Sequence, residues 1–295
     1  MELAEFRLVM TWLLSEATKE RSVQSSHKFG ILLNKDSNLN MNIMFKEIRH
    51  GDIEKIRERI AKNPAVVNEV FTGTKPKKDI AQSPLQVAIK CGEFEIIDLL
   101  LENGADADFM EDQSQKPADT SASYFMSMPV IHDAIIGAFN CIPYGELDRS
   151  ERYVAVIEKL LERGADPNKE TSPSHYDKEC IPPVGTLVRE ADEILHRYSD
   201  SHEIRGGEKF DAGRKHLFEI LDLLKKYGAD FDKWFDSKTW NGETRRAFYI
   251  EDFVPKEDKP YETVIRGKTF TGVIKGDVDH RKAIRAALQE YFKVK

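Results

Sequence analysis

The side chains that could do chemistry in this sequence are scattered, and only one group of them approaches a metal-binding pattern. His175 and Cys180 lie close together in the chain, and His196 and His202 follow at longer intervals. Zinc sites normally use two ligand pairs, each with two to five residues between its members. Only the loose His175 and Cys180 pair is present. The spacing therefore does not predict a metal site, and nothing else in the sequence signals a cofactor.

A second candidate is the run at residues 266–269, Arg-Gly-Lys-Thr, which resembles the end of a phosphate-binding loop. The first glycine of such a loop would fall at Glu262, and an acidic side chain there would repel the phosphate. The segments 262–265 and 269–274 are rich in β-branched and aromatic residues. They predict two strands with a hairpin turn at Gly267-Lys268 rather than a nucleotide site.

No familiar motif for a nucleophile, a metalloprotease helix or a dinucleotide-binding loop occurs in the sequence. Carboxylates are abundant, but Glu93, Glu95 and Glu102 occupy the expected solvent face of helices. The sequence therefore predicts a protein that is not an enzyme. If a catalytic group exists, we expect it in the C-terminal region.

Composition and charge narrow the class of partner. The chain has 295 residues, 32% of them charged, with 44 Lys and Arg against 51 Asp and Glu and a net charge of −7. Such a chain has no general affinity for phosphate backbones or anionic membranes, so we expect neither nucleic acid nor a membrane as partner. Residues 1–240 carry 32 basic and 42 acidic side chains, whereas residues 241–295 carry 12 and 9. We therefore expect a protein partner with a basic surface.

The cysteines and the apolar runs bear on location. Cys91, Cys141 and Cys180 are widely spaced and odd in number, which is typical of reduced thiols in a cytosolic protein. No apolar run approaches the roughly 20 residues of a membrane span, and the first residues are acidic where a secretory signal is basic. We expect a soluble, cytoplasmic protein. The sequence does not indicate its oligomeric state.

The elements that would position any site follow an internal repeat. In residues 83–106, two apolar segments are separated by Gly92, which predicts two short helices. Ser83 is a candidate N-cap, Pro84 suits the first helical position, and Gly104 is predicted to end the second helix in a left-handed conformation. Helices this short are unstable alone, so they must pack against neighbours.

The closing phrase Gly-Ala-Asp occurs three times after an apolar run, beginning at Gly104, Gly164 and Gly228. With the opening Ser83-Pro-Leu-Gln-x-Ala, it resembles the ankyrin repeat, whose units open with Thr-Pro-Leu-His-x-Ala. The resemblance implies stacked units of two helices and a projecting loop, with the three glycines in structural turns. It also implies that His132, at the histidine position of the third copy, makes a structural hydrogen bond in the turn that opens the first helix.

The copies are irregular. A degenerate first copy covers residues 44–68, and the fourth copy, which opens at Pro183, is weak. The three glycines are 60 and 64 residues apart, whereas a regular ankyrin period is about 33 residues, so each interval holds about 30 extra residues. Such insertions resemble those of bacterial or viral ankyrin proteins. We place them in two projecting loops, 109–128 and 169–182, and in two segments between helices, 140–151 and 199–212.

The projecting loops carry side chains of the kind found at interfaces. Tyr124 and Phe125 precede the third copy, and Tyr176 precedes the fourth. Exposed aromatic residues are enriched in protein interfaces, so these three are candidate partner-binding anchors. The same side chains could instead fold back and cover the insertions, and the sequence leaves both interpretations open.

These patterns predict a mainly α protein, an ankyrin-repeat solenoid of about four helix pairs with long loop insertions and a small α+β C-terminal appendage. We divide it into a cap helix and linker at 1–42, the array at 43–232, and a β-rich appendage with a C-terminal helix at 233–295. The resemblance implies a protein–protein interaction scaffold, and we hypothesise an inhibitor or an immunity or anti-defence protein that blocks another macromolecule. The alternative is an enzyme or effector whose appendage is catalytic and whose array recruits substrate.

Overall fold

The fold is described from a computed structural model of the chain. The structure describes residues 43–73, 76, 79–112, 114, 127–172, 180–198, 207–231, 236–238, 244–246, 259–265, 268–274 and 282–294. Within these residues the protein is mainly helical, as the sequence predicts. The predicted cap helix at residues 1–42 lies outside them.

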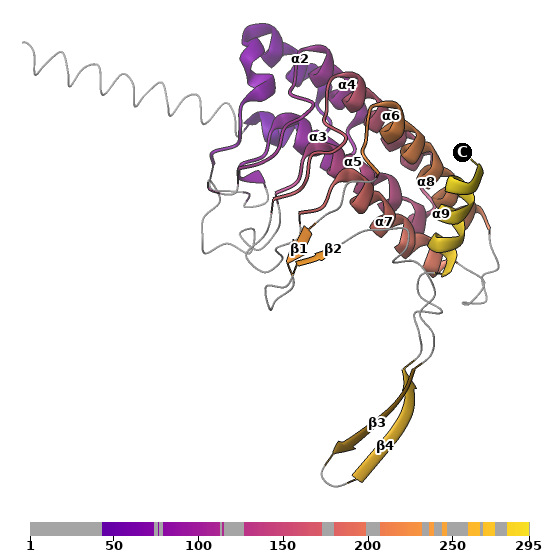
Figure 1. Cartoon of the computed structure of the whole chain (residues 1–295). Coiled ribbons are helices and arrows are strands. Elements are labelled where there is room, and N and C mark those ends of the chain that lie inside the picture. Colours follow the sequence, from indigo (N-terminus) through magenta and orange to yellow (C-terminus); the bar gives the residue numbers. More distant parts are fainter. Residues whose placement is uncertain are drawn as a thin grey trace, which may run out of the picture.

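The helices follow one another in pairs, and the pairs stack in sequence order (Figure 1). One row contains the first helix of each pair, with α3 against α5 and α5 against α7. A second row contains the other helices, with α2 against α4, α4 against α6 and α6 against α8. A helical segment at 43–49 precedes α2. The bounds are α2 (Ile53–Lys62), α3 (Pro84–Cys91), α4 (Phe94–Glu102), α5 (Val130–Asn140), α6 (Leu147–Glu162), α7 (Pro183–Arg197) and α8 (Glu208–Lys226).

The second pair shows why the sequence forms these helices. The Ser83 hydroxyl accepts a hydrogen bond from the Gln86 backbone N–H at 3.1 Å, and Pro84 occupies the first turn. The helix ends at Gly92, whose φ of +68° is accessible to glycine without strain. An added Cβ at Gly92 would also overlap the guanidinium of Arg149 from the next pair. Gly92 therefore both ends α3 and leaves room for the neighbouring unit.

The core lies between the two rows of helices. It consists of aliphatic side chains and a few phenylalanines that are almost completely removed from solvent, and burying each such side chain contributes about 1.5–3 kcal/mol relative to leaving it exposed. The largest are Phe45, Phe71, Phe139, Ile48, Ile56, Leu85, Ile89, Ile96, Ile97, Leu100, Leu101 and Ile131. No single pair could bury such a face alone, so the stack is the folding unit.

The insertion predicted between two helices at 140–151 is largely helical. Only residues 141–146, which include the 3-10 turn η5 (Ile142–Tyr144), separate α5 from α6. The early start of α6 is stabilised by contacts with the preceding pair. The Arg149 guanidinium donates to the Cys91 carbonyl at 2.7 Å, and Arg152 lies 4.2 Å from the centroid of the Phe94 ring. The extra residues therefore lengthen a helix instead of forming a loop.

The second interhelix insertion, predicted at 199–212, is also shorter than expected. Helix α8 begins at Glu208, so residues 198–207 lie between α7 and α8. The Lys209 ammonium donates to the Pro143 carbonyl at 2.6 Å. In α6 and in α8, a basic residue of the first turn therefore contacts a carbonyl at, or just after, the end of the first helix of the preceding pair.

The C-terminal region supplies one more helix, α9 (Lys282–Val294), which continues the first row by packing against α7. Ile284, Ala287, Leu288 and Tyr291 are buried there. The Tyr291 hydroxyl donates to the Asp222 carboxylate of α8 at 2.7 Å. Helix α9 therefore takes the place that the first helix of a further unit would take.

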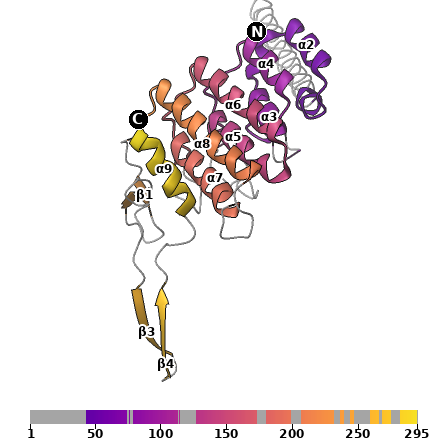
Figure 2. The same ribbon diagram turned by 90° about the vertical axis from the view of Figure 1, so that its right-hand side faces the viewer.

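Two antiparallel hairpins precede α9: β1 (Asp236–Lys238) with β2 (Thr244–Arg246), and β3 (Lys259–Ile265) with β4 (Lys268–Ile274). Ile265 pairs with Lys268, so the connection lies at 266–267, one residue earlier than predicted. Figures 1 and 2 both show the β3–β4 hairpin apart from the helices.

Candidate functional site

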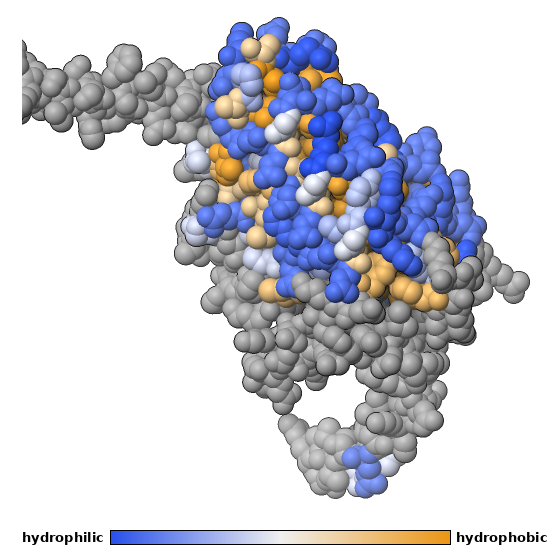
Figure 3. Space-filling view, turned by 45° about the horizontal axis from the view of Figure 1, so that its top comes forward, coloured by the Kyte–Doolittle hydropathy of each residue, from blue (hydrophilic) through white to orange (hydrophobic). Residues whose placement is uncertain are grey.

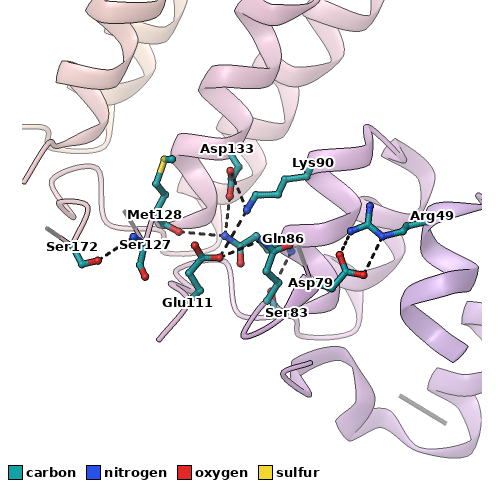
Figure 4. A network of polar contacts seen from close by, with 11 residues as sticks. Arg49, Asp79, Ser83, Gln86, Lys90, Glu111, Ser127, Met128, Asp133 and Ser172 are labelled. Carbon is teal, nitrogen blue, oxygen red and sulfur yellow. Dashed lines mark hydrogen bonds and ion pairs between the residues drawn. The ribbon is translucent and has the colours of Figure 1, made fainter. Parts of the chain in front are cut away.

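The stems of the loops predicted to bind a partner lie beside a polar network at one end of the first-row helices (Figure 4). At its centre is Gln86, which stands where the ankyrin pattern has histidine and is completely buried. Its amide nitrogen donates to the Asp133 carboxylate of α5 at 2.9 Å and to the Met128 carbonyl at 3.4 Å. One side chain therefore joins α3, α5 and the stem of the loop before α5.

Two acidic side chains and one lysine surround this amide. Lys90 of α3 places its ammonium 3.6 Å from a carboxylate oxygen of Asp133 and 3.8 Å from one of Glu111. Both carboxylates are buried. Burial raises the pKa of Asp133, while Lys90 and the Gln86 hydrogen bond act in the opposite direction. The cluster can hold the loop stem in place, but it contains no nucleophile paired with a base.

At the other end of the network, Arg49 joins the first unit to the segment before α3. Its guanidinium forms a two-pronged ion pair with Asp79, which is 1% exposed. A planar guanidinium matches a carboxylate in this way more specifically than a lysine would. The pair therefore fixes the segment before α3 against the helical residues 43–49.

His132, the predicted structural histidine, lies completely buried on α5. Its Nε2 is 3.0 Å from the Lys169 carbonyl oxygen, and its Nδ1 is 2.8 Å from the Thr186 hydroxyl of α7. Because a carbonyl oxygen only accepts, Nε2 carries the proton and Nδ1 accepts from the hydroxyl. Desolvation lowers the pKa of His132 to about 4, so the ring is neutral at physiological pH. These two side-chain hydrogen bonds therefore run to the segment before α7 and to α7 itself, joining the third unit to the fourth, instead of to the turn that opens α5, where the resemblance places the hydrogen bond.

The stems of the two long loops are joined directly. The Ser127 N–H donates to the Ser172 hydroxyl at 3.1 Å, and the Ser172 N–H donates to the Ser127 carbonyl at 2.9 Å. The second stem is closed by the Thr171 N–H, which donates to the Ile181 carbonyl at 2.9 Å. The loops before α5 and α7 therefore start from adjacent, hydrogen-bonded positions.

The three closing glycines all have positive φ, at +84° for Gly104, +95° for Gly164 and +92° for Gly228. They lie just after α4, α6 and α8. A side chain from the preceding unit contacts two of these turns. The Asn68 amide donates to the Gly104 carbonyl at 2.9 Å, and the Asn168 amide donates to the Gly228 carbonyl at 3.0 Å.

At the position between these two asparagines the chain has Asp108. Its carboxylate accepts from the Asp166 N–H at 3.0 Å, but it has no amide hydrogen to give the Gly164 carbonyl. Lys169 adds a second link between the two turns, because its ammonium lies 2.6 Å from the Asp108 carboxylate and 2.6 Å from the Asp108 carbonyl. The turn after α6 is therefore joined to the preceding unit by an ion pair. The turns after α4 and α8 are joined to theirs by an asparagine amide.

The predicted anchors Tyr124, Phe125 and Tyr176 lie outside the described residues, so their surroundings stay a prediction. Among the described residues, no group of three or more His, Cys, Asp or Glu side chains could hold a metal ion. His175 and His202 also lie outside, and His196 and Cys180 are the described members of that candidate cluster. No described helix is both long and apolar enough to span a bilayer.

Sequence reasoning missed the residues that join the units through the network. Gln86 and Asp133 are 47 positions apart, and Arg149 contacts Cys91 across 58. The signal that could have found Gln86 was its place in the Ser-Pro-Leu-Gln opening, where a buried polar side chain needs a partner. The partner itself depends on the stacking.

Comparison with known proteins agrees with this geometry. Residues 81–109 match the family model for an ankyrin repeat, and this segment contains α3, α4 and the turn after them. No curated protein matches the chain. The match at 81–109 and the stacked helix pairs around it support an ankyrin-repeat family for this chain.

Proposed function

We propose that this chain is a protein-binding scaffold, a solenoid of four ankyrin-type units over residues 43–232, and that it binds its partner through the two loops before α5 and α7. Ankyrin repeats support a protein–protein interaction role in general, and the match at 81–109 brings that expectation to this chain. The appendage at 233–295 is proposed as an accessory region, with α9 closing the array. Binding rather than catalysis is the proposed activity.

The main support for a loop interface is that the stems of the two loops are hydrogen-bonded to each other. Ser127 and Ser172 exchange two hydrogen bonds, so the described stems of the two loops lie next to each other. Tyr124, Phe125 and Tyr176 are proposed as apolar anchors. Because residues 1–240 carry an excess of ten acidic side chains, the partner is proposed to present a basic surface, which would raise the association rate.

The biological role that fits such a binder is stoichiometric inhibition, as in an immunity or anti-defence protein that blocks another macromolecule. The cytoplasm is the proposed location, since Cys91, Cys141 and Cys180 are widely spaced and odd in number, which is typical of reduced thiols. These proposals rest on the binding activity and fall with it.

The test is capture of the partner from the native cell, followed by kinetics with the purified pair. Replacing Tyr124, Phe125 and Tyr176 together by Ala should weaken binding by at least about 30-fold, mainly through faster dissociation. Added salt should mainly slow association. If the folded triple variant binds with unchanged affinity, the loop interface is wrong. If no protein is captured, the scaffold proposal itself fails.

A further inference from the structure

The face over the second-row helices contains an open groove between α6 and α8. Its volume is about 560 Å³, and its apolar floor consists of Val154, Ala155 and Leu223. Figure 3 shows this side of the molecule, where hydrophilic residues dominate and paler, more apolar residues lie between them. Val154 and Leu223 are half-buried and Ala155 is exposed, so the floor is open to a ligand from outside.

The groove lies where the third unit lacks an aromatic side chain that its neighbours have. Ten residues before each closing glycine, the second unit has Phe94, the third has Val154 and the fourth has Phe218. Phe94 packs edge-on against Tyr153, with 4.9 Å between ring centroids. Phe218 lies 5.5 Å from the Tyr291 ring of α9. Valine leaves this space unfilled between α6 and α8.

Charged side chains frame the floor at both ends. Lys215 pairs with Glu151 at 2.8 Å, and Lys226 pairs with Glu158 at 3.1 Å. Glu219 and Asp222 also line the groove, so its lining contains four carboxylates and two ammonium groups. Glu219 lies 3.2 Å from His216 and 3.8 Å from Lys215, and Asp222 accepts from the Tyr291 hydroxyl. Because the lining still holds two more carboxylates than ammonium groups, it favours an occupant that combines an apolar surface with positive charge.

The length of the groove indicates the shape of the occupant. Glu151 and Glu158 are seven residues apart on α6, which corresponds to about 10 Å along a helix. Two apolar side chains at positions i and i+4 of a bound helix are about 6 Å apart along its axis and would both fit between the two ion pairs.

We propose that the α6–α8 groove binds a basic amphipathic helix of a partner protein, with two neighbouring apolar side chains on the Val154, Ala155 and Leu223 floor and flanking Lys or Arg side chains facing Glu219 and Asp222. This rests on the proposed scaffold function and adds a second contact surface, separate from the loops. Helix-in-groove recognition uses this division between an apolar strip and a charged rim.

The probe is a fluorescein-labelled 16-residue helical peptide with two leucines at i and i+4 and lysines at the flanking positions, measured by fluorescence anisotropy. The native chain should bind it at least ten times more tightly than a matched peptide with glutamates in place of the lysines. Val154→Phe should weaken binding of the lysine peptide at least tenfold, because the ring fills the groove as Phe94 and Phe218 fill theirs. Equal binding of both peptides, or unchanged binding by Val154→Phe, would overturn the proposal.

Two further variants keep the result interpretable. Glu219→Gln removes one rim charge and should weaken the lysine peptide about threefold, whereas Glu162→Gln, on the exposed end of α6 and away from the groove, should leave it unchanged. Equal effects of these two variants would contradict the charge assignment. A thermal melt of Val154→Phe at or above the native midpoint shows that lost binding is not lost folding. If it unfolds, Ala155→Leu, which narrows the same floor, replaces it with the same expectation.

The loop variant separates this proposal from the preceding one. The Tyr124, Phe125 and Tyr176 triple alanine variant should bind the lysine peptide as the native chain does. If the triple variant loses the peptide while Val154→Phe retains it, the groove proposal is wrong and the loop interface is supported. If Val154→Phe weakens binding of both the peptide and the captured partner while the triple alanine variant binds the partner as the native chain does, the groove stands and the loop interface fails. If the captured partner binds the Val154→Phe variant with unchanged affinity, the groove proposal is wrong.

Discussion

Polar side chains join neighbouring units along both rows of helices, but the two rows differ in burial. In the first row, Gln86 and His132 are fully buried and each makes two hydrogen bonds to later units. In the second row, Lys159 pairs with Asp98 and Lys226 with Glu158, and these four side chains are 42–57% exposed. Water can replace the partners of the exposed pairs but not those of the buried groups. We infer that the buried polar groups of the first row set the stacking register and that the exposed ion pairs of the second row add little stability.

The largest effect expected from this difference between the rows is a loss of stability at low pH, caused by the buried His132 of the first row. The pKa of its buried ring is lowered to about 4 from 6.5, so the unfolded chain binds the proton more readily than the folded chain. Stability from the neutral ring is complete above pH 6.5 and is lost as the pH falls toward 4, by up to about 3 kcal/mol. Urea unfolding between pH 7 and 4 measures the loss.

The matched control is His132→Gln, since glutamine is the residue at the equivalent position 86. Carboxylates titrate in both proteins, so the difference between the two pH profiles isolates the histidine. The native chain should lose more stability than the variant between pH 6.5 and 4. Parallel profiles would show that His132 is not the buried, neutral group described.

A smaller effect is expected for Gln86→Leu. This change leaves the buried Asp133 carboxylate without its 2.9 Å donor, which should cost about 2 kcal/mol of unfolding free energy. Adding Asp133→Leu should recover part of that loss, because both partners are then apolar. Chemical denaturation of the native chain, the two single variants and the double variant measures the coupling. A double variant that loses the sum of the two single losses would contradict the pairing.

A loss of stability of intermediate size is expected at Gly104, which follows the second-row helix α4. Gly104 has a φ of +84°, but an added Cβ would meet no atom within 4 Å. Gly104→Val should therefore cost backbone strain alone, more than about 1 kcal/mol. Gly104→Asn should cost less, because asparagine tolerates positive φ. Thermal unfolding that ranks the two variants equally would contradict the strain argument.

The smallest effect is expected in the second row itself. Lys159 and Asp98 are 2.5 Å apart and roughly half exposed, and exposed pairs of this kind contribute about 0.5 kcal/mol. A double-mutant cycle with Lys159→Ala and Asp98→Ala should give a coupling energy of that order, smaller in 1 M salt. A coupling energy above about 2 kcal/mol would remove the proposed difference between the rows.

The sequence predicted well where the turns and helix caps of each repeat lie along the chain. It predicted poorly which distant residues come into contact. Gly92 and the Ser83 cap could be located because turns and caps depend on a few adjacent residues. The start of α6 at Leu147 could not, because Arg149 and Arg152 contact residues about 57 or 58 positions away. The loop stems followed from the repeat period, whereas the Gln86 network followed only from the stacking of α3 on α5.

The position of α9 constrains how this array could evolve. Repeat proteins lengthen by duplicating a unit, and a copy added after α8 would need the surface of α7 that α9 already covers. The duplicated helix would have to displace Ile284, Leu288 and Tyr291 from their contacts. New units are therefore expected to enter by duplication upstream of α7, and homologues with more repeats should retain the α7–α9 contact at the C-terminal end of a longer stack.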